Sequence, residues 1–358
     1  MAVRRQAEEG KRMPSQVFNR HYWSAQELVV LGVFSAAAKL STLLVALVGG
    51  GMNPVSLLAK NLIFTTLLVV MLYKVRKPGT LALFVLVNML ISMLLLGGSV
   101  IAIVGVLDDK YQLPAKVKLL GQIFAACVLV AFDIRIEWLN NPFGGYFYLN
   151  EWFISIPLTI FWVISFTNVV NLIDGLDGLA AGVSAIASMT VILVAVQMGY
   201  YHIAVMTAAL AGGIIGFIRY NFNPATIFMG DTGSMFIGYM LAAISVYGAV
   251  KTAATVALIV PAIALGLPIM DTAFAIMRRY SNGRPIFQPD KGHLHHRLLA
   301  MGMNQKQAVL LMYAITAVLG IAAVLWAEFD GFYAALIIAV IITAVAVGAK
   351  KIGILNDR

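Results

Sequence analysis

Long apolar runs follow one another along this 358-residue sequence and constrain its fold more than any other feature. A helix needs about 17 to 25 mainly apolar residues to cross a bilayer, and segments in lipid must pair their own backbone polar groups. Hydrophobic residues make up 61% of the chain and charged residues 11%, against roughly 25% charged residues in soluble domains. We therefore predict an all-α polytopic integral membrane protein with about 11 transmembrane helices. The expected spans lie near residues 25–48, 55–73, 80–107, 117–133, 152–168, 179–197, 203–219, 233–249, 252–270, 307–326 and 332–349.

The N-terminus, the single cysteine and the net charge narrow the class of protein further. The first 20 residues are polar and basic and lack the apolar core of a cleavable signal peptide, so we expect the first span to be retained. Cys127 lies in an apolar run and is expected to be a small buried hydrophobe; a lone cysteine excludes an internal disulfide. The net charge of +9 indicates basic loops at a membrane surface, and no nucleic-acid partner is expected.

The distribution of basic residues predicts the orientation of the chain. With eleven spans, the loops after the third, fifth, seventh and ninth spans lie on one face. The loop 271–306 carries six lysines and arginines and the tail after residue 349 three more, so this face is expected in the cytoplasm of a bacterial cell. Residues 134–151, rich in asparagine, glycine and aromatic side chains, are typical of a small extracytoplasmic hairpin.

The first hundred residues fit this orientation poorly. Lys74, Arg76 and Lys77 favour the cytoplasm, whereas the parity of the later spans places them outside. A helix break at Gly97 and Gly98 or an inverted third span would absorb the mismatch. We predict an atypical N-terminal membrane segment (1–98), a membrane domain (99–350) and a cytoplasmic tail (351–358).

Polar residues beside the spans indicate chemistry, most densely in residues 168–182, NVVNLIDGLDGLAAG. Asp174 and Asp177 are three residues apart and would face one side of a helical turn, while the glycines allow close approach to a ligand. A solvated turn between two spans is the alternative interpretation. Because ionisable groups near the bilayer are costly and usually mark a site, the pattern favours a site.

Two further stretches place carboxylates beside spans. In VLDDKYQLPAKVK, Asp108 and Asp109 end the third span, and adjacent carboxylates repel each other unless a cation lies between them. In NFNPATIFMGDTGSMF, Asp231 lies among glycines that would admit a diphosphate. Hard oxygen ligands of this kind suit magnesium. The alternatives are a solvated helix end for the first stretch and interfacial packing of Phe228 and Met229 for the second.

The fourth stretch, PDKGHLHHRL, places three histidines within four residues beside Arg297. Zinc is one interpretation, but no cysteine accompanies the histidines, and imidazoles beside a guanidinium are better donors to phosphate oxygens. Together the four stretches favour phosphoryl transfer from a nucleoside diphosphate to a membrane-resident acceptor. No GxxxxGK[ST] sequence occurs, which disfavours a P-loop enzyme.

In order and spacing, the four stretches resemble those of the polyprenyl-phosphate N-acetylhexosamine-1-phosphate transferases of glycosyltransferase family 4, over residues of about 99–350. PDK followed by HLHHR is similar to the branch that transfers GlcNAc-1-phosphate from UDP-GlcNAc to undecaprenyl phosphate, releasing UMP. Residues 104–300 are most similar to the enzymes that initiate teichoic acid; O-antigen and related polymers stay open. The lipid I branch carries three contiguous histidines, which this chain lacks.

The resemblance implies a site that faces the cytoplasm and binds Mg²⁺, with Mn²⁺ as an alternative ion. Among the implied residues, Asp108 and Asp109 would handle the prenyl phosphate, one as its general base, and Phe228 would stack on uracil. The implied catalytic residues are Asp108, Asp109, Asp174, Asp231 and Lys116, with Asp174 and Asp231 as metal ligands. The implied substrate-binding residues are Lys110, Asn168, Asn171, Gly175, Leu176, Asp177, Asn221, Phe228, Ser234, His293, His295, His296 and Arg297.

Residues before 99 depart from the family pattern. Members carry a basic loop ending in a PRMGG-like sequence between the first two spans, where this chain has VGGGMNPVS. Residues 23–98 instead weakly resemble the membrane-embedded substrate-binding component of energy-coupling-factor transporters. A membrane substrate-binding or transport protein and a catalytically impaired fusion are therefore the alternative functions. The sugar, a one-step or two-step reaction, and a monomer or homodimer all stay open.

Overall fold

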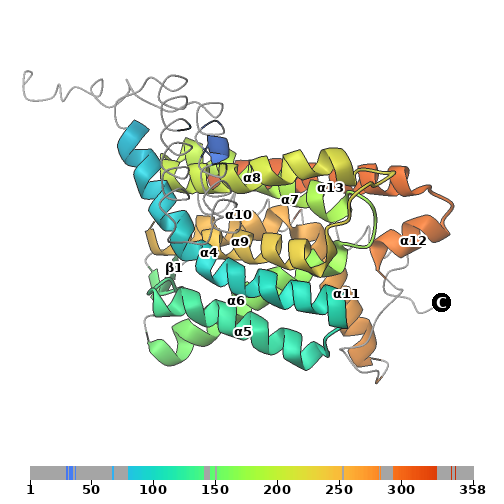
Figure 1. Ribbon diagram of the computed structural model, residues 1–358, viewed down its shortest axis with the longest axis horizontal. Helices are drawn as coiled ribbons and strands as arrows, with labels where there is room; N and C mark the ends of the chain where they lie inside the picture. Colours follow the sequence, from blue (N-terminus) through green and yellow to red (C-terminus); the bar gives the residue numbers. More distant parts are fainter. Residues whose placement is uncertain are drawn as a thin grey trace, which may run out of the picture.

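The computed structural model describes residues 30, 32–34, 37, 67, 80–140, 146–149, 151–251, 254–281, 283, 293–328, 340 and 343. Most of its helices run alongside one another, and short connections join them at two opposite ends (Figure 1). The elements are α4 (Thr80–Tyr111), α5 (Ala115–Ala131), β1 (Trp138–Asn140), β2 (Tyr146–Tyr148), α6 (Trp152–Ile173), α7 (Leu179–Gln197), α8 (Tyr201–Asn221), α9 (Gly230–Lys251), α10 (Ala254–Ala264), α11 (Gly266–Ser281), α12 (Leu294–Ala300) and α13 (Gln305–Glu328).

The helices have the length and composition of membrane spans. Helices α6, α7, α8, α9 and α13 are long and apolar enough to cross a bilayer, and the bent pair α10–α11 would make a sixth span. The mainly helical, multi-pass architecture is thus confirmed. The total of about 11 spans stays a prediction, because the expected spans 25–48, 55–73 and 332–349 lie almost entirely outside the described residues.

A single continuous helix over the expected span 252–270 is wrong, because the chain bends by 75° between α10 and α11. Helix α10 ends at Ala264 and α11 begins at Gly266. Pro268 lies in the first turn of α11, where its missing N–H costs no helical hydrogen bond. In a continuous helix the same proline would remove the bond to the Ala264 carbonyl. Apolarity alone did not reveal this break.

The suggested break at Gly97 and Gly98 is also wrong, because α4 continues through both residues. A Cβ at Gly97 would overlap the Tyr239 hydroxyl, and one at Gly98 would lie 2.9 Å from the Phe236 ring. The two glycines therefore let α9 pack closely against α4, as small residues do between membrane helices. The predicted domain boundary after residue 98 falls inside this helix, and the division itself stays a prediction. The basic residues between the second and third expected spans lie outside the described residues.

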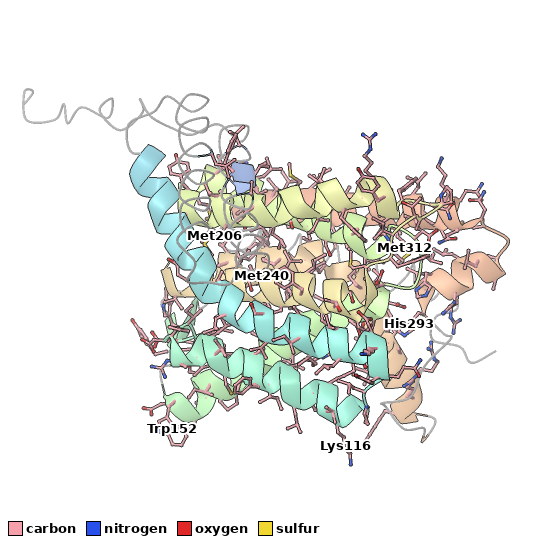
Figure 2. All side chains as sticks on the ribbon, in the orientation of Figure 1. Lys116, Trp152, Met206, Met240, His293 and Met312 are labelled. Atoms are coloured by element: carbon pink, nitrogen blue, oxygen red, sulfur yellow. The ribbon has the colours of Figure 1, made fainter. Side chains whose placement is uncertain are left out.

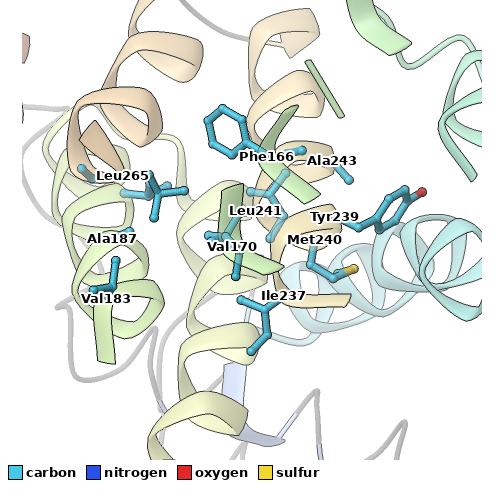
Figure 3. Packing of buried hydrophobic residues seen from close by; sticks show 14 of the residues in the cluster. Phe166, Val170, Val183, Ala187, Ile237, Tyr239, Met240, Leu241, Ala243 and Leu265 are labelled. Carbon is cyan, nitrogen blue, oxygen red and sulfur yellow. The ribbon is translucent and has the colours of Figure 1, made fainter. Parts of the chain in front are cut away.

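Helices α7 and α9 form the centre of the bundle. Their buried side chains meet those of α6 and α10, as Val170, Val183 and Leu241 illustrate in Figure 3. Alanine, glycine and serine are frequent along α7, which lets α8 and α13 pack against it. On the outside of the bundle, Cys127 of α5 is exposed and was wrongly expected to be buried. A membrane-facing position accepts an apolar side chain as readily as a core does, so hydropathy did not separate the two.

The small hairpin and the described parts of the four polar stretches lie at opposite ends of the bundle. Strands β1 and β2 pair antiparallel, with Trp138 opposite Tyr148, which confirms the expected hairpin. The hairpin and Trp152 lie at one end, whereas His293 and Lys116 lie at the other (Figures 1 and 2). The connections α4–α5, α6–α7 and α8–α9 reach this second end. That the loops after the third, fifth, seventh and ninth spans share one face stays a prediction.

Candidate active site

A lysine from α5 joins carboxylates from two other helices. The Nζ atom of Lys118 lies 2.5 Å from Oδ2 of Asp108, at the end of α4, and 2.6 Å from Oδ2 of Asp231, in the first turn of α9. The other Asp108 oxygen accepts the backbone N–H of Leu113 at 2.7 Å. Asp108 is buried and Asp231 is partly exposed. The ammonium group therefore balances two carboxylates at the edge of the bundle.

Asp109 has different partners from its neighbour Asp108. Its carboxylate accepts the N–H of Asp231 at 2.7 Å and both the N–H and the hydroxyl of Thr232, at 3.1 and 2.6 Å. It thereby caps the first turn of α9, where unpaired N–H groups favour an anion. Gly230 has a φ of 63°, and a Cβ there would lie 2.8 Å from Asp109. Consecutive helical residues point in different directions, so the two carboxylates serve different helices.

Helix α6 contributes amides to the same cluster. The side-chain amide of Asn171 donates to Oδ1 of Asp231 at 2.7 Å and lies 2.9 Å from the hydroxyl of Ser234. One turn earlier, Asn168 exchanges hydrogen bonds with Gln122 of α5, at 2.7 and 3.2 Å. Gln122 is fully buried. The pair therefore satisfies both amides inside the bundle, directly below the charged groups.

Asp174 follows α6 and faces the same carboxylates. Burial and the negative charges of Asp231 and Asp109 raise the pKa of Asp174 to about 7. A bound cation would offset both causes, because it would favour the ionised carboxyl. Asp177, three residues later, instead accepts the Asn223 side chain and the Ala225 N–H, each at 3.1 Å. The expectation that the two carboxylates share their surroundings is therefore not met.

The α8–α9 connection is held in place by Asn221 at the end of α8. The Asn221 side chain accepts the Gly178 N–H at 3.1 Å and donates to the Ile227 carbonyl at 2.9 Å. The next residue, Phe228, is 73% exposed. Its ring is therefore available to a planar ligand at the rim of the site. Leu176 packs against the core near this connection.

The histidines approach the site from the side of α11 and α12. Nδ1 of His293 lies 2.9 Å from Oδ2 of Asp271, a buried carboxylate of α11. The buried ring of His295 fits against Gly175, where a Cβ would lie 2.5 Å from Nε2. Burial, with the neighbouring histidines, lowers the pKa of His295 to about 4, so its imidazole is neutral near pH 7. His296 is exposed and stacks obliquely on His295, with ring centroids 4.2 Å apart.

The structure brings most of the predicted residues together and leaves two lysines aside. Lys116 is exposed at the start of α5 and points away from the bundle (Figure 2), and Lys110 is exposed over the Tyr111 ring. Arg297 lies partly buried on α12. The sequence prediction missed Lys118, Gln122 and Asp271 as site residues. The only signal for Lys118 was its place ten residues after Asp108, across the short connection between α4 and α5.

The site carboxylates are of the type that could contribute to a magnesium site. Within the described residues, no group of three or more histidine, cysteine, aspartate or glutamate side chains is arranged to hold a metal by itself. Magnesium commonly takes only one or two protein carboxylates together with waters and substrate phosphates. Asp231 and Asp174 supply such a pair of hard oxygen donors, and burial together with the charges of Asp231 and Asp109 raises the pKa of Asp174 to about 7. The donor set therefore fits magnesium better than a metal held by the protein alone.

The sequence is similar to a family model and to curated proteins. The model of glycosyl transferase family 4 matches residues 91–249. A probable undecaprenyl-phosphate N-acetylglucosaminyl 1-phosphate transferase of Bacillus subtilis is 40% identical over 262 residues, 73% of this chain and 73% of the relative. A decaprenyl-phosphate N-acetylglucosaminephosphotransferase of Mycobacterium leprae is 40% identical over 61% of this chain and 60% of the relative. A phospho-N-acetylmuramoyl-pentapeptide-transferase of Desulforudis audaxviator is 30% identical over 61% and 69%.

The fold and the site thus define a polytopic membrane protein with an acidic, lysine-bridged site at one end of its helical bundle. The chain belongs to glycosyl transferase family 4. The predicted family is thereby confirmed, including the similarity to relatives named for GlcNAc-1-phosphate transfer.

Proposed function

We propose that this protein transfers GlcNAc-1-phosphate from UDP-GlcNAc to undecaprenyl phosphate, releasing UMP and forming the first lipid-linked intermediate of a cell-envelope polymer. The observation that carries this proposal is the Lys118 bridge between Asp108 and Asp231, from three helices that meet at one end of the bundle. The acceptor and the transferred group are those named for the relative that is 40% identical over 73% of this chain, and UDP-GlcNAc is the donor that such a transfer implies. Teichoic acid is the polymer that the sequence resemblance favours.

The reaction needs positioning and charge balance more than covalent help from the protein. An oxygen of the lipid phosphate attacks the β-phosphorus of UDP-GlcNAc, a new P–O bond forms, and the bond to the UMP oxygen breaks. Both reactants are anionic, so their approach requires cations. Lys118 places its ammonium group between the carboxylates of Asp108 and Asp231, at 2.5 and 2.6 Å. In our proposal it moves its contacts to phosphate oxygens when the substrates bind.

Asp231 and Asp174 would hold the magnesium ion of this site. Asn171 donates to Asp231 and also to the Ser234 hydroxyl, so that Asn171 orients Asp231 and Ser234 helps to hold Asn171. When bound, the ion neutralises charge on the diphosphate. Asp109 acts on the protein side by fixing the first turn of α9, so that the Asp231 carboxylate stays in place. Phe228 would stack on uracil, with Asn221 and Asp177 holding the connection that presents its ring. His293, His295 and His296 would face the diphosphate or the sugar.

The proposed site faces the cytoplasm, because UDP-sugars are made there and the basic loops favour that side. Two exposed positions test this orientation, Lys116 at the catalytic end and Tyr148 at the hairpin end. Each is replaced by cysteine in a Cys127→Ala background, because Cys127 is itself exposed. A membrane-impermeant thiol reagent added to intact cells should label position 148 and not position 116. Labelling at 116 alone would invert the proposed topology.

The reaction itself is tested with the purified full-length protein, undecaprenyl phosphate and a panel of UDP-sugars, with UMP as the readout. We expect UMP release from UDP-GlcNAc, loss of release with EDTA, and recovery with Mg²⁺. The panel includes UDP-MurNAc-pentapeptide, because one relative is named for a pentapeptide substrate. A membrane substrate-binding or transport protein would release no UMP from any donor. A catalytically impaired fusion would bind UDP-GlcNAc without turnover.

A further inference from the structure

A buried carboxylate outside the lysine-bridged cluster has both of its oxygens directed at the histidine stretch. Asp271 lies in the second turn of α11 and is 7% exposed. Its Oδ2 lies 2.9 Å from Nδ1 of His293, and its Oδ1 accepts the N–H of Leu294 at 2.8 Å. Burying a carboxylate is costly unless its oxygens are paired. Among the described residues, this carboxylate is paired to the start of α12.

The contact determines which nitrogen of His293 carries a proton. An ionised carboxylate has no proton to give and only accepts hydrogen bonds. With Asp271 as the acceptor of this contact, the proton lies on Nδ1 of His293. Nε2 is then the ring nitrogen of His293 that can accept a hydrogen bond from a ligand. In this way the carboxylate sets both the orientation and the tautomer of the imidazole.

Helix capping alone does not explain this arrangement. His293 is the N-cap residue of α12 and makes no side-chain capping bond, while Asp271 takes the N–H of Leu294 from outside the helix. A serine or aspartate at position 293 would cap the helix without any buried partner. The imidazole at this position therefore has a use other than holding the helix.

The histidine stretch also contacts the α6–α7 turn. The rings of His293 and His295 are parallel within 5°, with centroids 6.0 Å apart. His295 in turn lies directly against Gly175, next to Asp174. Asp271 thus connects α11, through two parallel imidazoles, to the turn that carries a proposed metal ligand.

We infer that Asp271 is a positioning residue of the transferase: it fixes His293 with its proton on Nδ1 and Nε2 directed to the sugar-phosphate part of the donor. The inference rests on the proposed function. Asp271 touches no substrate in this account and acts only through His293. Removing the carboxylate should therefore slow turnover more than it weakens donor binding.

The kinetic test compares Asp271→Asn, His293→Gln and the double variant with the wild type. Asp271→Asn keeps the size of the side chain, but its amide NH₂ can donate to Nδ1 and so favours the other tautomer. We expect kcat for UMP release to fall about tenfold to a hundredfold in each single variant, with KM for UDP-GlcNAc within about threefold of the wild type. The kcat of the double variant should be no lower than that of the less active single variant, within about twofold. Additive losses would overturn the inference, as would a kcat of Asp271→Asn within about twofold of the wild type.

The matched control is Asp133→Asn at the hairpin end, where the carboxylate is exposed and pairs with Arg135 two residues away. Its UMP release should equal that of the wild type. A merely structural role for Asp271 would lower the melting temperature and the amount of folded protein without changing kcat per folded molecule.

A spectroscopic test is independent of turnover. The chain has five histidines, so ¹⁵N-histidine labelling with one substitution at a time assigns the His293 ring signals. We expect the protonated nitrogen of His293 to be Nδ1 in the wild type, and a bare Nδ1 would overturn the inference even if Asp271→Asn fails to fold. If the wild type releases no UMP, the proposed function fails while this measurement still decides on the Asp271–His293 pair.

Discussion

The two ends of the helical bundle use the same kinds of charged side chain in opposite ways. At the hairpin end, Arg135 pairs with Asp133 and Glu137, each two residues away along the chain. At the catalytic end, Lys118 and Asp231 are 113 residues apart, and Asp109 and the N–H of Asp231 are 122 apart. Local pairs satisfy a loop wherever it lies. Long-range pairs form only when several helices have assembled. The charged pairs at the catalytic end therefore depend on the tertiary structure.

Removing one carboxylate from each end should give the largest difference between the two ends. Asp231→Asn should reduce UMP release by roughly 10²–10³-fold while the protein stays folded, because a charge near the diphosphate is lost and no packed volume changes. Asp133→Asn should leave release unchanged. Both are measured on purified protein with matched melting curves. More than about a tenth of wild-type activity in Asp231→Asn, a loss under about 1.4 kcal/mol, would rule out its metal role.

Two lysines of the same helix sharpen the comparison within the catalytic end. Lys118 bridges two carboxylates, whereas Lys116 is exposed and points away. Lys118→Ala should cost about tenfold to a hundredfold in kcat/KM, since Asp108 then keeps a buried charge without its cation. Lys116→Ala should cost less. Equal losses in steady-state assays would restore Lys116 to the catalytic role that the sequence resemblance implied.

Exposed aromatic rings offer a third pair. Phe228 is 73% exposed at the catalytic end and Tyr148 is 71% exposed at the hairpin end. Phe228→Ala should raise KM for UDP-GlcNAc by a factor that corresponds to roughly 1–3 kcal/mol of base stacking, and Tyr148→Ala should not. Competition by UMP, measured with both variants, separates nucleotide binding from sugar binding. Unchanged UMP affinity in Phe228→Ala would place the uracil elsewhere.

Substitutions in the apolar middle of the bundle should change the stability of the protein and leave its catalytic rate unchanged. Gly97→Ala should destabilise the protein by about 1–3 kcal/mol, because its Cβ would overlap Tyr239. Gly213→Ala on α8, where no atom lies within 4 Å of the added Cβ, is the matched control and should gain up to about 1 kcal/mol. Melting temperatures in one detergent give both values. A more stable Gly97→Ala would mean that α4 and α9 pack less closely than described.

The smallest effect concerns pH. The pKa of His295 is lowered to about 4 in the folded protein, below the unfolded value of roughly 6.5. Protonation therefore favours the unfolded chain, and the stabilising contribution present above pH 6.5 is lost as pH falls towards 4. Between pH 7.5 and 5.5 the loss should be about 1 kcal/mol. His295→Gln should show a shallower fall in melting temperature than His296→Gln, whose exposed ring is the control; identical slopes would contradict the assignment.

The sequence predicted the helices and the polar ends but not the pairing inside the site. Apolar runs located α4 to α9 and α13 because lipid-spanning helices must be apolar along their whole length. The hairpin followed from the asparagine, glycine and aromatic residues of 134–151, and the expectation that the four stretches lie on one face followed from span parity. Several site residues, including Asp108, Asn171 and Asp231, lie on helix ends instead of loops, since the helices extend beyond the apolar runs.

What the sequence could not supply was the direction of each side chain. Lys116 and Lys118 are two residues apart and point to different sides of α5, and only the positions of α4 and α9 decide which one meets the carboxylates. No sequence pattern marks Gln122 as a site residue, and only its hydrogen bonds with Asn168 reveal its role. Asp271 stood in an apolar run, and its partner His293 lies 22 residues away, beyond the reach of a local pattern.

The lysine bridge also has a consequence for how the protein is made. With one ammonium group held by Asp108 and Asp231, the chain balances these carboxylates from its own sequence as soon as α4, α5 and α9 assemble. The chain thus carries its own counter-charge for the two carboxylates, and packing α4 against α9 does not leave these two negative charges facing each other unbalanced.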